Sequence, residues 1–257
     1  MTKTPAALSI GVAAAIGPEI GASLAPLVES AGFHALWVND TPGHDALDVL
    51  AAAARVTDRL MLATGVLPMD RRTSREVLAR IGELDLPVDR LVLGIGSGAR
   101  SVGALATVTD AAAALRTGPS ARIVVGALGP KMRRTGAEAS DGLLLSWLTP
   151  DLAARQADEA RTITPETHVA LYVRAAAEPG AAPALAAETA RYAGYPAYAA
   201  NFARLGIDAS QTTIAPGDGT DRIDAYRDAV DEVVLRAITA DGSGASYARL
   251  IEAYAPR

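Results

Sequence analysis

Short apolar runs recur along the chain, and each is followed by a stretch in which apolar positions return every three or four residues. The runs have the length of β-strands and are continuously apolar, which is typical of parallel strands covered by helices on both faces. Eight such runs occur, at residues 8–14, 35–39, 60–66, 90–95, 122–126, 142–145, 169–175 and 231–239. The pattern therefore predicts eight units of a strand followed by a helical segment.

The helical stretches agree with this arrangement. They are expected at residues 18–31, 46–56, 74–84, 181–193 and 196–205, with further helices beginning at Pro130, at Pro150 and near Gly244. Proline is well tolerated at the first position of a helix, and Thr149 before Pro150 is a good N-cap. Eight units in 257 residues predict one α/β domain over residues 1–257, a closed (β/α)8 TIM barrel, with a doubly wound open sheet as the alternative.

Composition supports this fold class. Half of the residues are apolar but only 4% are aromatic, and alanine supplies the excess, with runs of four at 51–54 and 111–114. Alanine is the best helix former, so a helix-rich α/β fold is favoured over an all-β one.

Charge narrows the range of partners. The net charge is -5, with 24 Lys+Arg against 29 Asp+Glu and no basic run, which argues against nucleic acid and anionic membranes as partners. No stretch approaches the roughly 18 apolar residues of a membrane span. The chain has no cysteine, so thiolate zinc sites and disulfides are excluded, and a cytoplasmic location is expected.

Candidate chemistry lies at the carboxyl ends of the predicted strands, where barrel enzymes place their working residues. Glycine gathers there, and it allows the backbone to approach an extended, flat ligand. The candidates from the ends of five strands are Asn39 and Asp40, Thr64 to Val66 with Gly65 between them, Gly96, Ser97 and Gly98, Ala127 to Met132, and Ser146.

The loop after the strand at 122–126 is the most informative of these. Its residues are Ala127, Leu128, Gly129, Pro130, Lys131 and Met132. They end a strand and begin a helix, so free backbone N–H groups and the positive helix end face the ligand side. Phosphate is the natural occupant, although glycine and proline also serve the geometry of such a turn alone.

Titratable groups are few in this region. The three histidines have no metal-ligand spacing, so no metal site is expected. Asp40 is a candidate catalytic acid that would need a raised pKa, and it is equally suited to a turn. Arg71 and Arg72 are most simply a solvated helix start, although one arginine could reach an anionic ligand.

Five segments resemble the bacterial luciferase-like superfamily, in particular its branch that uses the deazaflavin coenzyme F420. They are GFxALWVxD at 32–40, ATGV at 63–66, RLVLGIGxG at 90–98, ALGPKM at 127–132 and AxDGLLLxWLTP at 139–150. They occur in the order found in the family, and the likeness extends over about residues 8 to 155.

This resemblance implies a flavin-type ring at the mouth of the barrel. Gly65 and Val66 would form a backbone bulge behind the ring, often with a non-proline cis peptide, Asp40 would lie near the ring, and residues 129–132 would hold the phosphate. Relatives often have histidine where this chain has Thr41, and their segment corresponding to 99–121 is longer and covers the site. The resemblance also suggests a homodimer.

Three functions follow from these expectations. The first is hydride transfer between coenzyme F420 and a small organic substrate. The second is an FMN-dependent monooxygenase on the same barrel, in which reduced flavin activates oxygen. The third is a barrel without catalysis that binds cofactor weakly or not at all, to which the short segment at 99–121 and the missing histidine point.

Overall fold

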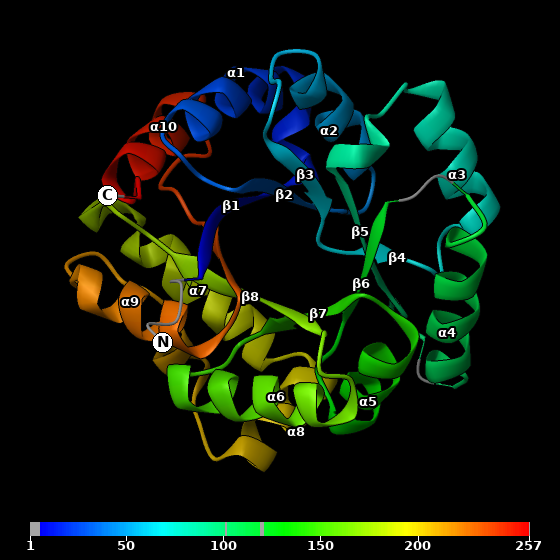
Figure 1. The fold of residues 1–257 in the computed structure, drawn as a ribbon. Helices are drawn as coiled ribbons and strands as arrows, with labels where there is room; N and C mark the ends of the chain where they lie inside the picture. Colours follow the sequence, from blue (N-terminus) through cyan, green and yellow to red (C-terminus); the bar gives the residue numbers. More distant parts are fainter. Residues whose placement is uncertain (1–5, 101, 119–120, 257) are drawn as a thin grey trace.

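Eight parallel strands close into a barrel in the computed structural model, which describes residues 6–100, 102–118 and 121–256 (Figure 1). The strands around the ring are β1 (Ala7–Ala13), β2 (Ala35–Asn39), β3 (Met61–Thr64), β5 (Leu91–Gly96), β6 (Arg122–Gly126), β7 (Gly142–Ser146), β8 (His168–Ala175) and β9 (Glu232–Ala237). β9 pairs with β1, and β3 pairs with β5, so no edge remains open. The predicted TIM barrel is confirmed.

A short interruption divides the third predicted strand. The two-residue strand β4 (Leu67–Pro68) follows β3 after the peptide bond between Gly65 and Val66, which is cis. β4 pairs with the end of β5, where Leu67 is opposite Ile95. The cis bond that the resemblance implied is present, and it lies between the two strands.

Ten α-helices lie in the described part of the chain, mostly around the outside of the ring. They are α1 (Gly17–Ser30), α2 (Ala46–Ala54), α3 (Ser74–Glu83), α4 (Ala104–Leu115), α5 (Pro130–Ala139), α6 (Pro150–Ile163), α7 (Ala182–Ala193), α8 (Pro196–Leu205), α9 (Thr220–Ala229) and α10 (Gly244–Ala253). Local sequence sets their starts: Thr73 and Glu76 form a reciprocal capping box on α3, and Asp45 caps α2. The polar helix α9 was not predicted.

Two apolar layers hold the barrel together. The larger one lies between strands and helices, and the smaller one fills the barrel interior with side chains such as Trp37, Val124, Tyr172 and Val234. A TIM barrel is therefore filled, not hollow, and its free space lies at the ends of the strands.

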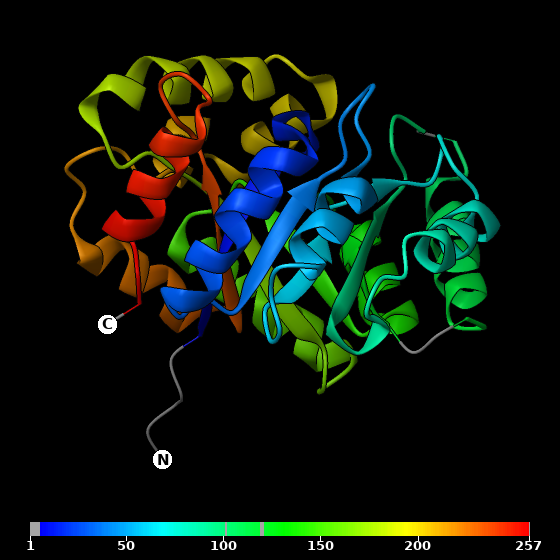
Figure 2. The ribbon, with the colours of Figure 1, turned by 90° about the horizontal axis from the view of Figure 1, so that it is seen from above.

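One end of the barrel carries additional cover. α7 and α8, in the connection between β8 and β9, lie across the end toward which the strands point, which is the mouth (Figure 2). Among the described residues between β5 and β6 there is one helix, α4, so the cover comes from a later part of the chain than in the expectation drawn from relatives. No helix in the described ranges is long and apolar enough to cross a membrane.

Candidate functional site

A cavity of about 560 Å³ opens at the mouth, within the size range of small-molecule and cofactor sites. It lies over the carboxyl ends of the strands and under α7 and α8. Its walls come from most of the strands of the barrel. The lining residues are Asn39, Asp40, Gly65, Val66, Pro68, Arg71, Gly96, Ser97, Gly98, Ala99, Arg100, Gly126, Ala127, Leu128, Gly129, Met132, Leu144, Ser146, Tyr172, Arg174, Tyr192, Ala197 and Tyr198.

Twelve of the fifteen residues predicted for the site line this cavity. The other three are Thr64, Pro130 and Lys131. Thr64 is fully buried, and its hydroxyl donates to the Gly94 carbonyl at 2.9 Å, so it joins neighbouring strands. Pro130 and Lys131 begin α5 with exposed side chains, and they stay candidates through their position in the first turn.

The backbone at Gly65 and Val66, called here the Gly65–Val66 edge, is closely packed against Tyr172. A Cβ atom on Gly65 would lie 2.3 Å from the Tyr172 hydroxyl, so only glycine fits there. The Asn39 amide donates to the Gly65 carbonyl, and its oxygen accepts from Arg236 Nε at 2.8 Å. This edge is therefore held in place before any ligand arrives.

The Tyr172 hydroxyl has no hydrogen-bond partner although it is buried in the cavity wall. Burial is the main cause that raises the pKa of Tyr172, so the hydroxyl stays protonated and can donate. Its ring lies at an edge-to-face angle to Trp37, with centroids 6.1 Å apart. An unpaired donor in this position needs a ligand atom or water as its acceptor.

The start of α5 forms a second wall. Gly129 is its N-cap residue, and a Cβ there would meet nothing within 4 Å, so the turn is open on its cavity side. Backbone N–H groups in a first helical turn lack partners within the helix, which makes this end a receptor for anions. Arg133 braces the turn from behind, because it donates to the Leu128 carbonyl and pairs with Glu159 at 2.8 Å.

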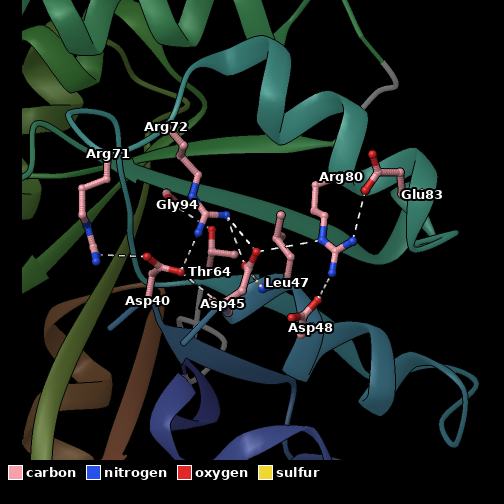
Figure 3. Close-up of polar contacts among 11 residues, drawn as sticks. Asp40, Asp45, Leu47, Asp48, Thr64, Arg71, Arg72, Arg80, Glu83 and Gly94 are labelled. Carbon is pink, nitrogen blue, oxygen red and sulfur yellow. Dashed lines mark hydrogen bonds and ion pairs between the residues drawn. The ribbon is translucent and has the colours of Figure 1, made fainter. Parts of the chain in front are cut away.

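Asp40 is held by two arginines and a backbone amide (Figure 3). Its Oδ2 is 3.0 Å from Arg71, and its Oδ1 is 3.3 Å from Arg72 and 3.1 Å from the Ala46 nitrogen. Burial raises the pKa of Asp40 against the opposing effects of that amide and the two arginines. The carboxylate lines the cavity, yet both of its oxygens are already engaged.

The same ion-pair cluster extends away from the cavity. Arg72 also pairs with Asp45, and Arg80 reaches Asp45, Asp48 and Glu83 (Figure 3). These contacts join the loop after β4 to the start of α2. Arg71 lines the cavity with its guanidinium on Asp40, so it is the member of the arginine pair that would lie beside a ligand in this cavity.

Arg174 is the main site residue that the sequence did not reveal. It lies near the end of β8, is 4% exposed and lines the cavity. Its guanidinium carbon is 4.0 Å from the ring centroid of Trp147 and 4.7 Å from that of Tyr192. The alternation of Ala170, Tyr172 and Arg174 on the inner face of β8 was the one signal that could have found it.

The histidines lie away from this cavity. His168, at the start of β8, contacts Glu232 at 3.2 Å at the opposite end of the barrel, and neither His34 nor His44 lines the mouth. Within residues 6–100, 102–118 and 121–256, no group of three His, Cys, Asp or Glu is placed to hold a metal ion.

The fold is a (β/α)8 barrel with a cavity at its mouth, and comparisons with known proteins show what it is similar to. Residues 8–106 match the family of luciferase-like monooxygenases, which confirms the resemblance predicted from the sequence and supports an enzyme of the oxidoreductase class. No curated protein matches the sequence.

Solved structures of such barrels superpose over nearly the whole chain. A monooxygenase from Streptomyces bottropensis is 18% identical, with a TM-score of 0.70 and 97% of each chain covered. The coenzyme F420-dependent tetrahydromethanopterin reductase from Methanopyrus kandleri is 15% identical, with a TM-score of 0.73 and 98% of each chain covered. The FMN complex of the oxygenating constituent of 3,6-diketocamphane monooxygenase from Pseudomonas putida is 14% identical, with a TM-score of 0.65 and 97% of each chain covered. At these identities the likeness establishes the fold.

Proposed function

We propose that the protein is an oxidoreductase that binds a flavin-type cofactor in the mouth of the barrel and acts on a small organic molecule. Coenzyme F420 is the cofactor we favour, and FMN is the alternative. The observation that carries the proposal is one cavity joining the Gly65–Val66 edge to the open turn at Gly129. A flat ring against the first and a phosphate on the second would occupy the two walls together.

The residues present fit such a group. Val66 and the glycines around it offer a flat apolar wall, Gly129 leaves its turn open, and the Tyr172 hydroxyl is an unused donor. When bound, a deazaflavin supplies a hydride donor or acceptor, whereas a reduced flavin also activates oxygen. In this proposal the protein holds the phosphate, orients the ring and, through α7 and α8, excludes water.

The contacts of Asp40 refine its proposed role. Burial raises the pKa of Asp40, but both of its carboxylate oxygens are engaged by Arg71, Arg72 and a backbone amide, so neither is free to exchange a proton with a ligand. We propose that Asp40 contributes chiefly by holding Arg71 at the cavity wall. Asp40→Asn would then weaken cofactor binding without removing an ionisation from the pH profile of turnover.

A titration with the two cofactors tests the proposal. The purified protein is mixed with oxidised FMN or with F420, and cofactor fluorescence is followed. Micromolar binding of F420 alone supports hydride transfer, and binding of FMN alone supports the monooxygenase. Binding of neither would overturn the proposal in favour of a barrel without a cofactor.

Two matched glycine variants locate the phosphate. Gly129→Val should weaken cofactor binding at least about tenfold, because the side chain would block the turn. Gly219→Val is the control, since Gly219 is the N-cap of α9 in the same extended conformation, is exposed and lies outside the cavity. Equal affinities of the two variants would contradict the assignment of the turn.

A further inference from the structure

The charges around the cavity are opposite in sign to the charge of the whole protein. The chain carries a net charge of -5, yet the charged residues in the cavity wall are Arg71, Arg100 and Arg174 against Asp40 alone. Asp40 is already shared between Arg71 and Arg72. The mouth is therefore a cationic site in an acidic protein, which attracts anions.

Arg174 is the most deeply buried of these cations, and its contact with a carboxylate is long. Its Nε has no hydrogen-bond partner, and its nearest carboxylate oxygen, on Glu188, is 3.9 Å away. Glu188 is in closer contact with Arg191. The hydrogen bond that Arg174 makes is to the neutral hydroxyl of Ser146.

Other arginines that point into the protein have more hydrogen-bond partners than Arg174. Arg133 pairs with Glu159 and donates to a backbone carbonyl. Arg90 donates to Thr57 and to the carbonyls of Leu60 and Ala54. Among the described residues, Arg174 has only a long contact to a carboxylate, at 3.9 Å, and that carboxylate is shared with Arg191. Because a weakly compensated buried charge is unfavourable, an anion beside Arg174 would complete its pairing.

A second arginine lies beside Arg174. Arg236 occupies the position of β9 that pairs with Arg174 in the parallel register. It donates to the Asn39 side chain and to the Ala237 carbonyl, which are both neutral. Burial, and to a smaller extent Arg236, lower the pKa of Arg174, although an arginine keeps its charge at neutral pH.

Aromatic rings surround this part of the cavity. Tyr192 from α7 and Tyr198 from α8 line it, and Trp147 lies against the guanidinium. These rings would cover the apolar body of a ligand whose anionic end reaches Arg174. α7 and α8 lie beyond residue 106, where the family match ends.

We propose that Arg174 and the tyrosines of α7 and α8 form a substrate subsite for an organic carboxylate with an apolar body. Arginine presents a planar fork that matches a carboxylate in two hydrogen bonds. The inference rests on the proposed function, because subsite and cofactor share one cavity, and it gives that function a substrate class. The competing anions are those of the cofactor itself, for whose phosphate we propose the turn at Gly129, and cofactor titrations of the Arg174 variant distinguish them from a substrate.

Carboxylates and their neutral amides test the subsite directly. Benzoate and hexanoate are compared with benzamide and hexanamide in ligand-observed NMR titrations of the full chain without cofactor. The wild-type protein should bind at least one carboxylate at least about tenfold more tightly than its amide, the value of one charge-assisted bond. Equal binding of acid and amide, or no saturable binding of either acid, would overturn the proposal.

Variants assign the preference to Arg174. In Arg174→Met the acid-to-amide ratio should fall to about one, whereas Arg174→Lys should retain part of it. Arg191→Met is the matched control, because it removes a charge that also lies near Tyr192 but is exposed and outside the cavity. A ratio that persists in Arg174→Met, or is lost equally in Arg191→Met, would contradict the assignment.

Cofactor titrations separate the two sources of the anion. Arg174→Met should change the dissociation constant of F420 or FMN less than about threefold, while Gly129→Val changes it at least about tenfold. The reverse pattern would assign Arg174 to the cofactor and overturn the substrate subsite. If neither cofactor binds but the acid preference is present and depends on Arg174, the proposed function fails and the subsite stands.

Discussion

The two ends of the barrel interior are built by the same strands, but they differ in how many of their buried polar groups have hydrogen-bond partners. At the closed end, the start of β9, Glu232 is 2% exposed and both of its oxygens have partners. Ser9 and Trp37 each donate to Oε1 at 2.6 Å, and His168 lies 3.2 Å from Oε2. At the mouth, Arg174 is nearly as buried, and its Nε has no hydrogen-bond partner among the described residues and only a long contact, 3.9 Å, with Glu188.

The difference extends beyond these two residues. Six buried side-chain atoms lack a hydrogen-bond partner among the described residues, and they belong to Thr41, Trp147, Thr167, Tyr172, Arg174 and Asn201. Five of them lie on the mouth side, in or beyond the carboxyl halves of strands, and only Thr167 lies at the closed end. The closed end thus leaves one such atom, whereas the mouth leaves several, and those of Tyr172 and Arg174 lie in the cavity wall, where a barrel enzyme binds its ligand.

Loss of the Glu232 carboxylate should have the largest effect on stability. Glu232→Leu would leave the Trp37 and Ser9 donors buried without an acceptor, and the free energy of unfolding should fall by about 3 kcal/mol. Urea denaturation followed by circular dichroism measures it. Glu252→Leu, an exposed control on α10, should stay within about 0.5 kcal/mol of wild type. A Glu232 variant as stable as this control would contradict the conclusion that paired polar groups stabilise the closed end.

The pH dependence of stability should also trace to Glu232. Burial would raise the pKa of this carboxyl, but hydrogen bonds from His168, Ser9 and Trp37 outweigh burial and lower it. The resulting stabilisation is fully present above the ordinary value of 4.5 and is lost as the pH falls through the lowered value. Unfolding free energies measured across this range should decline more steeply for wild type than for Glu232→Gln. Parallel profiles would show that Glu232 is not the responsible group.

Most of the fold could be predicted from sequence because parallel strands under helices are continuously apolar. The segments 35–39 and 122–126 were predicted with the bounds of β2 and β6. α9 was missed because its segment is polar, with buried contacts at Ile223, Tyr226 and Ala229 only.

The candidate site could be predicted only where it consists of strand ends and glycine turns. Tyr172 and Arg174 lie inside an apolar strand. Their role depends on which face of that strand points into the barrel. Tyr192 and Tyr198 come to the mouth through packing of α7 and α8, which no local pattern reveals. The engagement of Asp40 likewise depends on Arg71 and Arg72, some thirty residues away in the chain.

Replacement of Arg174 at the mouth should change the free energy of unfolding in the opposite direction to replacement of Glu232. Arg174→Met keeps an unbranched apolar side chain in place of the arginine stem and removes the buried charge, so the free energy of unfolding should rise by about 1 kcal/mol. Arg133→Met is the internal comparison and should lower it, because Arg133 is paired with Glu159. Thermal and urea denaturation measure both. A loss of stability in Arg174→Met as large as in Arg133→Met would mean that Arg174 has a structural role.

The smallest effect on stability is expected for the Tyr172 hydroxyl. Tyr172→Phe removes a buried O–H that has no partner, so the free energy of unfolding should change by less than about 0.5 kcal/mol. Tyr226→Phe is the matched variant, since the Tyr226 hydroxyl donates to the Leu148 carbonyl at 3.0 Å, and its loss should cost about 1 kcal/mol. Affinity for the cofactor should show the reverse order, with Tyr172→Phe weaker by about threefold to tenfold and Tyr226→Phe unchanged. A hydroxyl that contributes to binding and not to folding would show that the donors at the mouth are kept for a ligand.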